Sequence, residues 1–114
     1  MKAVTIKSLQ VVTHPETKKL FWFMFAGTRG GMNRIKILQH LQRNPTNTHK
    51  LSQEVGIDYK GVQHHLKVLS QNNLVTKVGS NYGGVYFPSE LFEGSKAVFD
   101  EIVTRLSMEN HNAY

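Results

Sequence analysis

The chain of 114 residues is long enough for one compact domain, and its 39% hydrophobic and 19% charged residues are typical of a globular protein. The absence of cysteine excludes disulfides, thiol catalysis and zinc–thiolate sites. A formal net charge of +6 favours a polyanionic partner, nucleic acid before a membrane surface. The longest apolar run, Leu20 to Gly27, is far shorter than the roughly 20 residues that span a bilayer, and no signal peptide is visible, so we expect a cytoplasmic protein.

The positive charge is concentrated in the middle of the chain. Residues 27–88 hold eight Lys and Arg against Glu54 and Asp58, which gives +6. Residues 1–26 hold four Lys against Glu16 and give +3, whereas residues 89–114 hold Lys96 and Arg105 against five acidic residues and give −3. We therefore expect a polyanion to contact the middle of the chain and to avoid its C-terminal segment.

The first 26 residues predict a strand followed by a helix. The segment MKAVTIKSLQVV is rich in β-branched residues, which favour a strand. Pro15 suits the first turn of a helix, and ETKKLFWFMFA continues that helix to Gly27. Because the apolar residues of Leu20–Phe25 follow one another without a clean helical stripe, a hairpin of the two segments is the alternative. In both cases the aromatic surface must be covered, by the domain itself or by a second chain.

Three helices are predicted between GTRGG (Gly27–Gly31) and Asn73. The first, MNRIKILQHLQRN, ends before Pro45 and has apolar residues at near-helical spacing (Met32, Ile35, Leu38, Leu41) and an outer face with Asn33, Arg34, Lys36 and Arg43. Asn47 caps the second, THKLSQEV, which Gly56 ends. Asp58 caps the third, YKGVQHHLKVLSQNN, whose inner stripe is Val62, Leu66 and Leu69.

A hairpin and a last helix complete the pattern. LVTKVGSNYGGVYFP predicts two strands, residues 74–78 and 85–87, around a Gly/Asn/Ser-rich tip at 79–84. Pro88 and Ser89 open a helix with acidic residues on one side and an apolar stripe on the other (Val98, Phe99, Ile102, Val103, Leu106).

The order of helix, short helix, tight turn with Gly56, second helix and hairpin predicts a winged helix-turn-helix. The fold class is therefore mainly α with a small β-hairpin wing (α+β). We divide the chain into an N-terminal extension (1–26), a winged helix-turn-helix domain (27–88) and a C-terminal helix for dimerisation (89–114). The alternative is a small α+β domain that has no role with nucleic acids.

The segment DYKGVQHHLKVLSQNNLV resembles the recognition-helix region of ArsR-type winged-helix transcription regulators, and the longer stretch that begins FAGTRGGMNRIKILQHLQRN resembles the small archaeal members of that group. The resemblance covers about residues 20–90 and implies a homodimer that binds a palindromic operator. Two features depart from it. The cysteine pair of metal-sensing members is absent, which excludes metal sensing through that site. Gly61 stands where the family usually has Thr or Ser, so one expected contact is lost or the backbone approaches DNA more closely.

The adjacent histidines His64 and His65 do not form a metal site. At about 100° per residue, His64 lies almost opposite the inner stripe and His65 on its flank, and neighbours on a helix do not converge on one ion. We expect His65 to be a half-buried packing residue, like the histidine before leucine that the family often has. His64 is a candidate DNA contact or simply a solvated histidine.

Candidate DNA contacts fall in three groups. The recognition helix (59–72) presents Tyr59, Lys60, Gln63, His64 and Lys67, where Gln63 can pair adenine and Lys60 can reach guanine or a phosphate. Phosphate contacts are assigned to Arg34 and to the start of the second helix, Asn47, Thr48 and His49. The wing contributes Lys77, Ser80, Asn81 and Tyr82, and a bare solvent-exposed hairpin is the alternative.

Eight large apolar residues are assigned to a dimer interface, with core packing inside one chain as the equal alternative (Phe21, Trp22, Phe25, Val98, Phe99, Ile102, Val103, Leu106). We hypothesise a homodimeric, sequence-specific regulator of transcription that binds double-stranded DNA, lies in the cytoplasm with the nucleoid, and has no catalytic residues, cofactor, metal or membrane contact. The alternatives are an architectural DNA coat of low sequence specificity and a protein-interaction winged helix of the transcription machinery.

Overall fold

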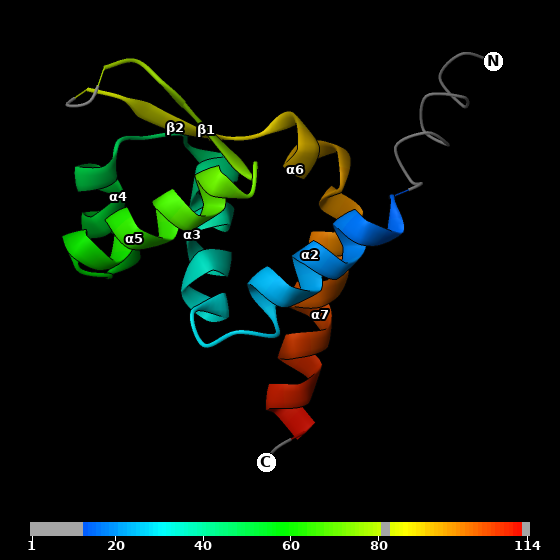
Figure 1. The fold of residues 1–114 in the computed structure, drawn as a ribbon. Coiled ribbons are helices and arrows are strands. Elements are labelled where there is room, and N and C mark those ends of the chain that lie inside the picture. The colour runs from blue at the N-terminus through cyan, green and yellow to red at the C-terminus, as the bar shows by residue number, and fades with distance from the viewer. Residues whose placement is uncertain (1–12, 81–82, 113–114) are drawn as a thin grey trace.

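The computed structural model describes residues 13–80 and 83–112, so the strand predicted in residues 1–12 lies outside the described residues. Within the described residues, six helices and one antiparallel hairpin follow in order (Figure 1): α2 (Pro15–Phe25), α3 (Gly31–Arg43), α4 (Thr48–Val55), α5 (Tyr59–Gln71), β1 (Val75–Val78), β2 (Val85–Pro88), α6 (Glu90–Gly94) and α7 (Lys96–Asn112). The predicted fold class, mainly helical with a two-stranded wing, is confirmed. None of the described helices is long and apolar enough to cross a membrane.

The helix-turn-helix forms where its capping residues predict it. The Asn47 side chain accepts a hydrogen bond from the Lys50 N–H at 2.8 Å, and the Asp58 carboxylate accepts one from the Gly61 N–H at 3.2 Å. Each cap satisfies an N–H group that has no partner inside its helix. Gly56 ends α4 with a φ of 72°, a left-handed conformation that suits glycine. These three residues fix the short turn between α4 and α5.

The aromatic residues form the core on the other side of the molecule. Residues 15–25 are helical and not part of a hairpin, because Phe21, Met24 and Phe25 recur at helical spacing and are all buried. Their rings meet those of the C-terminal segment in an aromatic cluster, defined as Phe21, Phe25, Phe92 and Phe99, with ring centroids 4.9–6.4 Å apart. Figure 1 shows α2 lying across α7. The aromatic cluster joins α2 to α6 and α7.

Residues after the wing form two helices and not the one predicted. α6 ends at Gly94, and α7 begins at Lys96 after a break at Ser95. Ser89 caps α6 by accepting from the Phe92 N–H at 3.0 Å, and its hydroxyl donates to the Asn73 carbonyl at 2.7 Å. The break turns the chain so that Phe92 and Phe99 both enter the aromatic cluster.

The structure corrects the assignment of a dimer interface for five of the eight predicted residues. Phe21, Phe25, Val98, Phe99 and Ile102 are buried within the single chain, each 6% exposed or less. Their surface is used in the chain's own core, so it is not available to a second chain. Trp22, Val103 and Leu106 are half-buried and pack against this core. Met32, predicted on the inner face of its helix, is 50% exposed.

The wing is joined to the helix-turn-helix by its backbone. β1 and β2 pair antiparallel with Lys77 opposite Tyr86 and Thr76 opposite Phe87. The Tyr86 N–H donates to the Thr46 carbonyl at 2.9 Å, which links β2 to the segment between α3 and α4. The position of the wing relative to α4 and α5 is therefore set by hydrogen bonds and not only by its loop.

Candidate nucleic-acid interface

Helix α5 presents a polar, positively charged face. Val62, Leu66 and Leu69 are at most 1% exposed and hold the helix against the core. The opposite side carries the recognition face, defined as Lys60, Gln63, His64 and Lys67, and all four side chains are exposed. They are brought together with Tyr86 of β2 around one hollow of about 560 Å³, called here the interface hollow. The helical spacing in the sequence predicts this grouping except for Tyr86.

Side chains of the recognition face are available to a ligand. Within residues 13–80 and 83–112, Lys60, Gln63 and Lys67 form no hydrogen bond or ion pair with another side chain. The exposed face of α5 thus carries two ammonium groups and one amide. Groups of these kinds contact phosphates and base edges. The arrangement therefore suits a double-stranded nucleic acid.

The histidines of α5 divide as predicted. His64 is exposed and His65 is half-buried, with ring centroids 5.6 Å apart. Across the described part of the chain, no group of three or more His, Asp or Glu residues is placed to hold a metal ion.

The start of α4 lies beside the start of α5. The side chain of Asn47 is occupied by its cap, and Thr48 is half-buried. His49 is exposed, and its ring centroid lies 6.4 Å from that of Tyr59, which is 46% exposed. His49, a predicted backbone contact, and Tyr59, a predicted recognition-helix residue, thus present accessible side chains together, whereas the Asn47 side chain caps α4.

The wing supplies a residue that sequence reasoning missed. The Lys77 ammonium lies 5.8 Å from the centroid of the Tyr86 ring, which is half-buried and borders the interface hollow. Ser80 is exposed, and Asn81 and Tyr82 lie outside the described residues. Strand alternation carries the missing signal, because residues paired across a hairpin share a face and Lys77 pairs with Tyr86.

Arg34 is a structural residue, which corrects its assignment as a phosphate contact. It is 6% exposed, and its Nε donates to the Met24 carbonyl at 2.8 Å. One further nitrogen donates to the Thr28 hydroxyl, and Nη1 lies 3.4 Å from His65 Nδ1. Burial lowers the pKa of Arg34 from its usual value. The guanidinium contacts Met24 of α2 and His65 of α5, and it does not face solvent.

A glycine makes room for this contact. A Cβ atom built on Gly30 would lie 2.6 Å from Arg34 Nη1 and 2.7 Å from His65 Cε1. Any larger residue at position 30 must displace both side chains. Gly30, in the GTRGG segment before α3, therefore allows the close packing of α3 against α5 in addition to its place in the turn.

His65 must be neutral for this arrangement. Arginine has no acceptor, so His65 Nδ1 accepts and carries no proton. Burial lowers the pKa of His65, with the nearby Arg34 charge and His64 as smaller causes. Protonation would place two cations in contact.

We expect the fold to lose stability as the pH falls below about 6.5, the usual pKa of histidine. Because the folded-state pKa of His65 is lowered, the unfolded chain takes up the proton first, and the stabilisation present at higher pH is lost. Urea unfolding at pH 7.5 and pH 5.5 measures the loss, and His65→Gln should reduce it. His49→Gln, at an exposed position, is the control and should keep it. An equal loss in His65→Gln and wild type would contradict this assignment.

A buried contact between α3 and α4 was also missed. His40 of α3 is buried, and its Nε2 contacts the Glu54 carboxylate of α4. Its Nδ1 is buried without a hydrogen-bond partner among the described residues. The contact joins α4 to α3.

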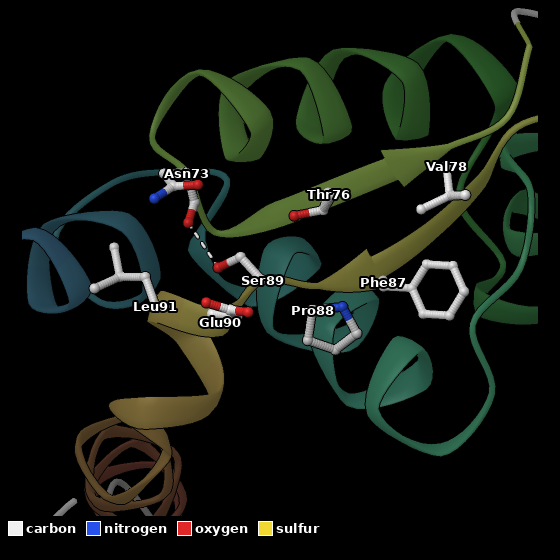
Figure 2. A pocket seen from close by; sticks show the side chains of 8 residues that line it. All are labelled: Asn73, Thr76, Val78, Phe87, Pro88, Ser89, Glu90 and Leu91. Carbon is white, nitrogen blue, oxygen red and sulfur yellow. Dashed lines mark hydrogen bonds between the residues drawn. The ribbon is translucent and has the colours of Figure 1, made fainter.

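Figure 2 shows a different hollow, on the opposite face of the hairpin. It has a volume of about 420 Å³ and is lined by Asn73, Thr76, Val78, Phe87, Pro88, Ser89, Glu90 and Leu91. Glu90 is the one charged residue in this lining, and Figure 2 also shows the hydrogen bond from the Ser89 hydroxyl to the Asn73 carbonyl. A polyanion is therefore expected at the face with Tyr86 and not at the face with Phe87.

Gly61 lies on the side of α5 that faces the preceding turn. A Cβ atom at this position would lie 2.8 Å from Asp58 Oδ1 and 3.1 Å from Ile57 Cγ2. The missing side chain thus faces the turn before α5 and not the recognition face. A hydroxyl side chain at position 61 would meet the capping carboxylate of Asp58 first.

The middle of the chain is similar to a known protein family. Residues 32–77 match the family described as "Bacterial regulatory protein, arsR family". No curated protein is significantly similar to the chain.

Solved structures share the fold. The transcriptional regulator YodB of B. subtilis, in its reduced form, is 22% identical, with a TM-score of 0.60 over 82% of this chain and 90% of that one. Reduced HlyU of Vibrio cholerae is 21% identical, with a TM-score of 0.58 over 80% and 90% of the two chains. The transcriptional regulator BldR of Sulfolobus solfataricus is 12% identical, with a TM-score of 0.61 over 87% and 74%.

Together the fold and the matched segment define a DNA-binding transcription regulator of the winged helix-turn-helix type, and not an enzyme. Within it, residues 32–77 are similar to the arsR family of regulatory proteins.

Proposed function

We propose that the chain binds double-stranded DNA sequence-specifically, with α5 in the major groove and the wing (79–84) at the backbone or in the minor groove. The observation that carries this proposal is the recognition face, where Lys60, Gln63 and Lys67 are exposed and make no hydrogen bond or ion pair within the described residues. A major groove about 12 Å wide admits one helix, and a glutamine there pairs adenine bidentately. His64 belongs to the same face and Tyr59 extends it. His49, Thr48, Ser80 and Lys77 are proposed to meet phosphates at its edges. Asn81 and Tyr82 remain proposed wing contacts.

We further propose that the regulator is a homodimer. Trp22, Val103 and Leu106 are half-buried, and Phe23, Met32 and Met108 are 50% exposed or more. Met32, Val103 and Leu106 also border a hollow of about 210 Å³ between α3 and α7. An apolar surface of this kind favours a second copy of the chain. Two recognition helices would then read half-sites about 34 Å apart, or roughly 10 base pairs.

We also propose that the chain is divided at residues 26 and 88, and that the C-terminal segment contributes to dimerisation. The resemblance of residues 20–90 supports placing the protein among small archaeal regulators of this type. The net charge of +6 favours association with the nucleoid in the cytoplasm.

Selection from a random pool of duplex DNA tests the function. We expect one enriched palindromic motif. We also expect affinity for that motif to fall by about 10³-fold between 50 and 200 mM salt if six phosphates are contacted, because phosphate contacts release counterions. Binding without an enriched motif would favour the architectural coat. Failure to bind any duplex at 50 mM salt would favour a protein-interaction domain. A flat salt response would contradict a phosphate-dominated interface.

A further inference from the structure

Tyr86 lies on the opposite wall of the interface hollow from α5. The hollow is bordered by the recognition face on one side and by Tyr86 of β2 on the other. Tyr86 forms no hydrogen bond through its hydroxyl with any residue in the described part of the chain. A phenol has one donor, which is available here to whatever fills the hollow.

The position of Tyr86 is fixed by three contacts. Its N–H donates to the Thr46 carbonyl at 2.9 Å, it pairs with Lys77 across the hairpin, and its ring lies 5.8 Å from the Lys77 ammonium. These contacts hold the ring at a set place relative to α5 before any ligand binds. Preorganisation of this kind reduces the cost of ordering a side chain on binding.

The chemistry of the walls identifies the occupant. Lys60 and Lys67 supply two cations on one wall, Lys77 supplies a third behind the Tyr86 ring, and none of the five lining residues is acidic. This combination of ammonium groups and a neutral hydroxyl fits a phosphodiester, whose oxygens accept hydrogen bonds from both. The hollow in Figure 2 provides the contrast, because its charged lining residue is Glu90.

We propose that Tyr86 donates a hydrogen bond to one backbone phosphate of the DNA strand that passes between α5 and the wing, and so sets how deeply α5 enters the groove. The inference rests on the proposed function. Tyr86 is a positioning residue, which adds affinity for every sequence and reads no base.

The test compares Tyr86→Phe with wild type on a selected site and on an unrelated duplex. Loss of one hydrogen bond to a charged group should weaken binding to both duplexes by the same factor, about 10-fold. The salt dependence should not change, because a neutral hydroxyl releases no counterion, whereas Lys67→Ala should make the slope shallower by about one. Phe87→Leu, on the other face of the same strand, is the control for the hairpin and should bind like wild type.

Ethylation of single phosphates locates the contact. One phosphate whose ethylation weakens wild type should have no further effect on Tyr86→Phe. If wild type binds DNA and Tyr86→Phe binds equally well, the inference fails and the proposed function stands. If Tyr86→Phe changes the order of preferred sequences, Tyr86 reads a base and the inference also fails. If wild type binds no duplex, both fail.

Discussion

Lys60→Ala combined with Gln63→Ala is expected to abolish sequence-specific binding while the protein stays folded. Both side chains are exposed and make no hydrogen bond or ion pair within the described residues, so their loss leaves no unsatisfied group in the core. Two base contacts at about 1–3 kcal/mol each correspond to roughly 30-fold to 10⁴-fold weaker binding to the selected site. Binding to unrelated duplex should change far less, because Lys67 and the wing still meet phosphates.

Titration of both duplexes at one salt concentration measures this difference. Lys18→Ala combined with Lys19→Ala is a demanding control, since it removes two charges from exposed positions of α2. That variant should keep its preference for the selected site. Unchanged preference in the Lys60/Gln63 double variant would remove α5 from the role of recognition helix.

The largest effect on stability is expected from Phe92→Ala. The Phe92 side chain is fully buried, and its ring centroid lies 5.7 Å from that of Phe21, 6.4 Å from Phe25 and 4.9 Å from Phe99. Truncation of a phenylalanine in such a site leaves a cavity and costs about 3–5 kcal/mol. Since small domains are stable by about 5–15 kcal/mol, this variant should be close to unfolding.

Urea unfolding measures the change, with Phe87→Ala as the matched control. Phe87 is 39% exposed, so the same truncation five residues earlier should cost far less. Equal losses in the two variants would mean that the aromatic cluster does not carry the stability assigned to it.

Local signals predict most of the helix-turn-helix. Asn47, Gly56 and Asp58 act within a few residues of the helix ends they define, so their effect is visible in sequence. The inner stripe of α5 is visible for the same reason, because helical spacing alone decides which residues face the core.

The misplaced residues depend on contacts between distant segments. Arg34 occupies a buried position because the Met24 carbonyl and His65 receive its guanidinium, and neither partner is visible from α3 alone. Its spacing from Leu38 and Leu41 was the available signal, but a charged residue is usually exposed. Tyr86 was missed because its role depends on strand register, and the aromatic cluster depends on α2 meeting α6 and α7.

The backbone hydrogen bond between Tyr86 and Thr46 connects the wing to the helix-turn-helix. The link joins the segment before α4 to β2, so we expect the spacing between α5 and the hairpin to change little when DNA binds. A protein with a constant spacing between its recognition helix and its wing is expected to distinguish duplexes by shape as well as by sequence. B-form DNA, with its wide major groove, fits a helix on one side of a strand and a hairpin on the other. A-form duplexes, whose major groove is deep and narrow, would be rejected before any base is read.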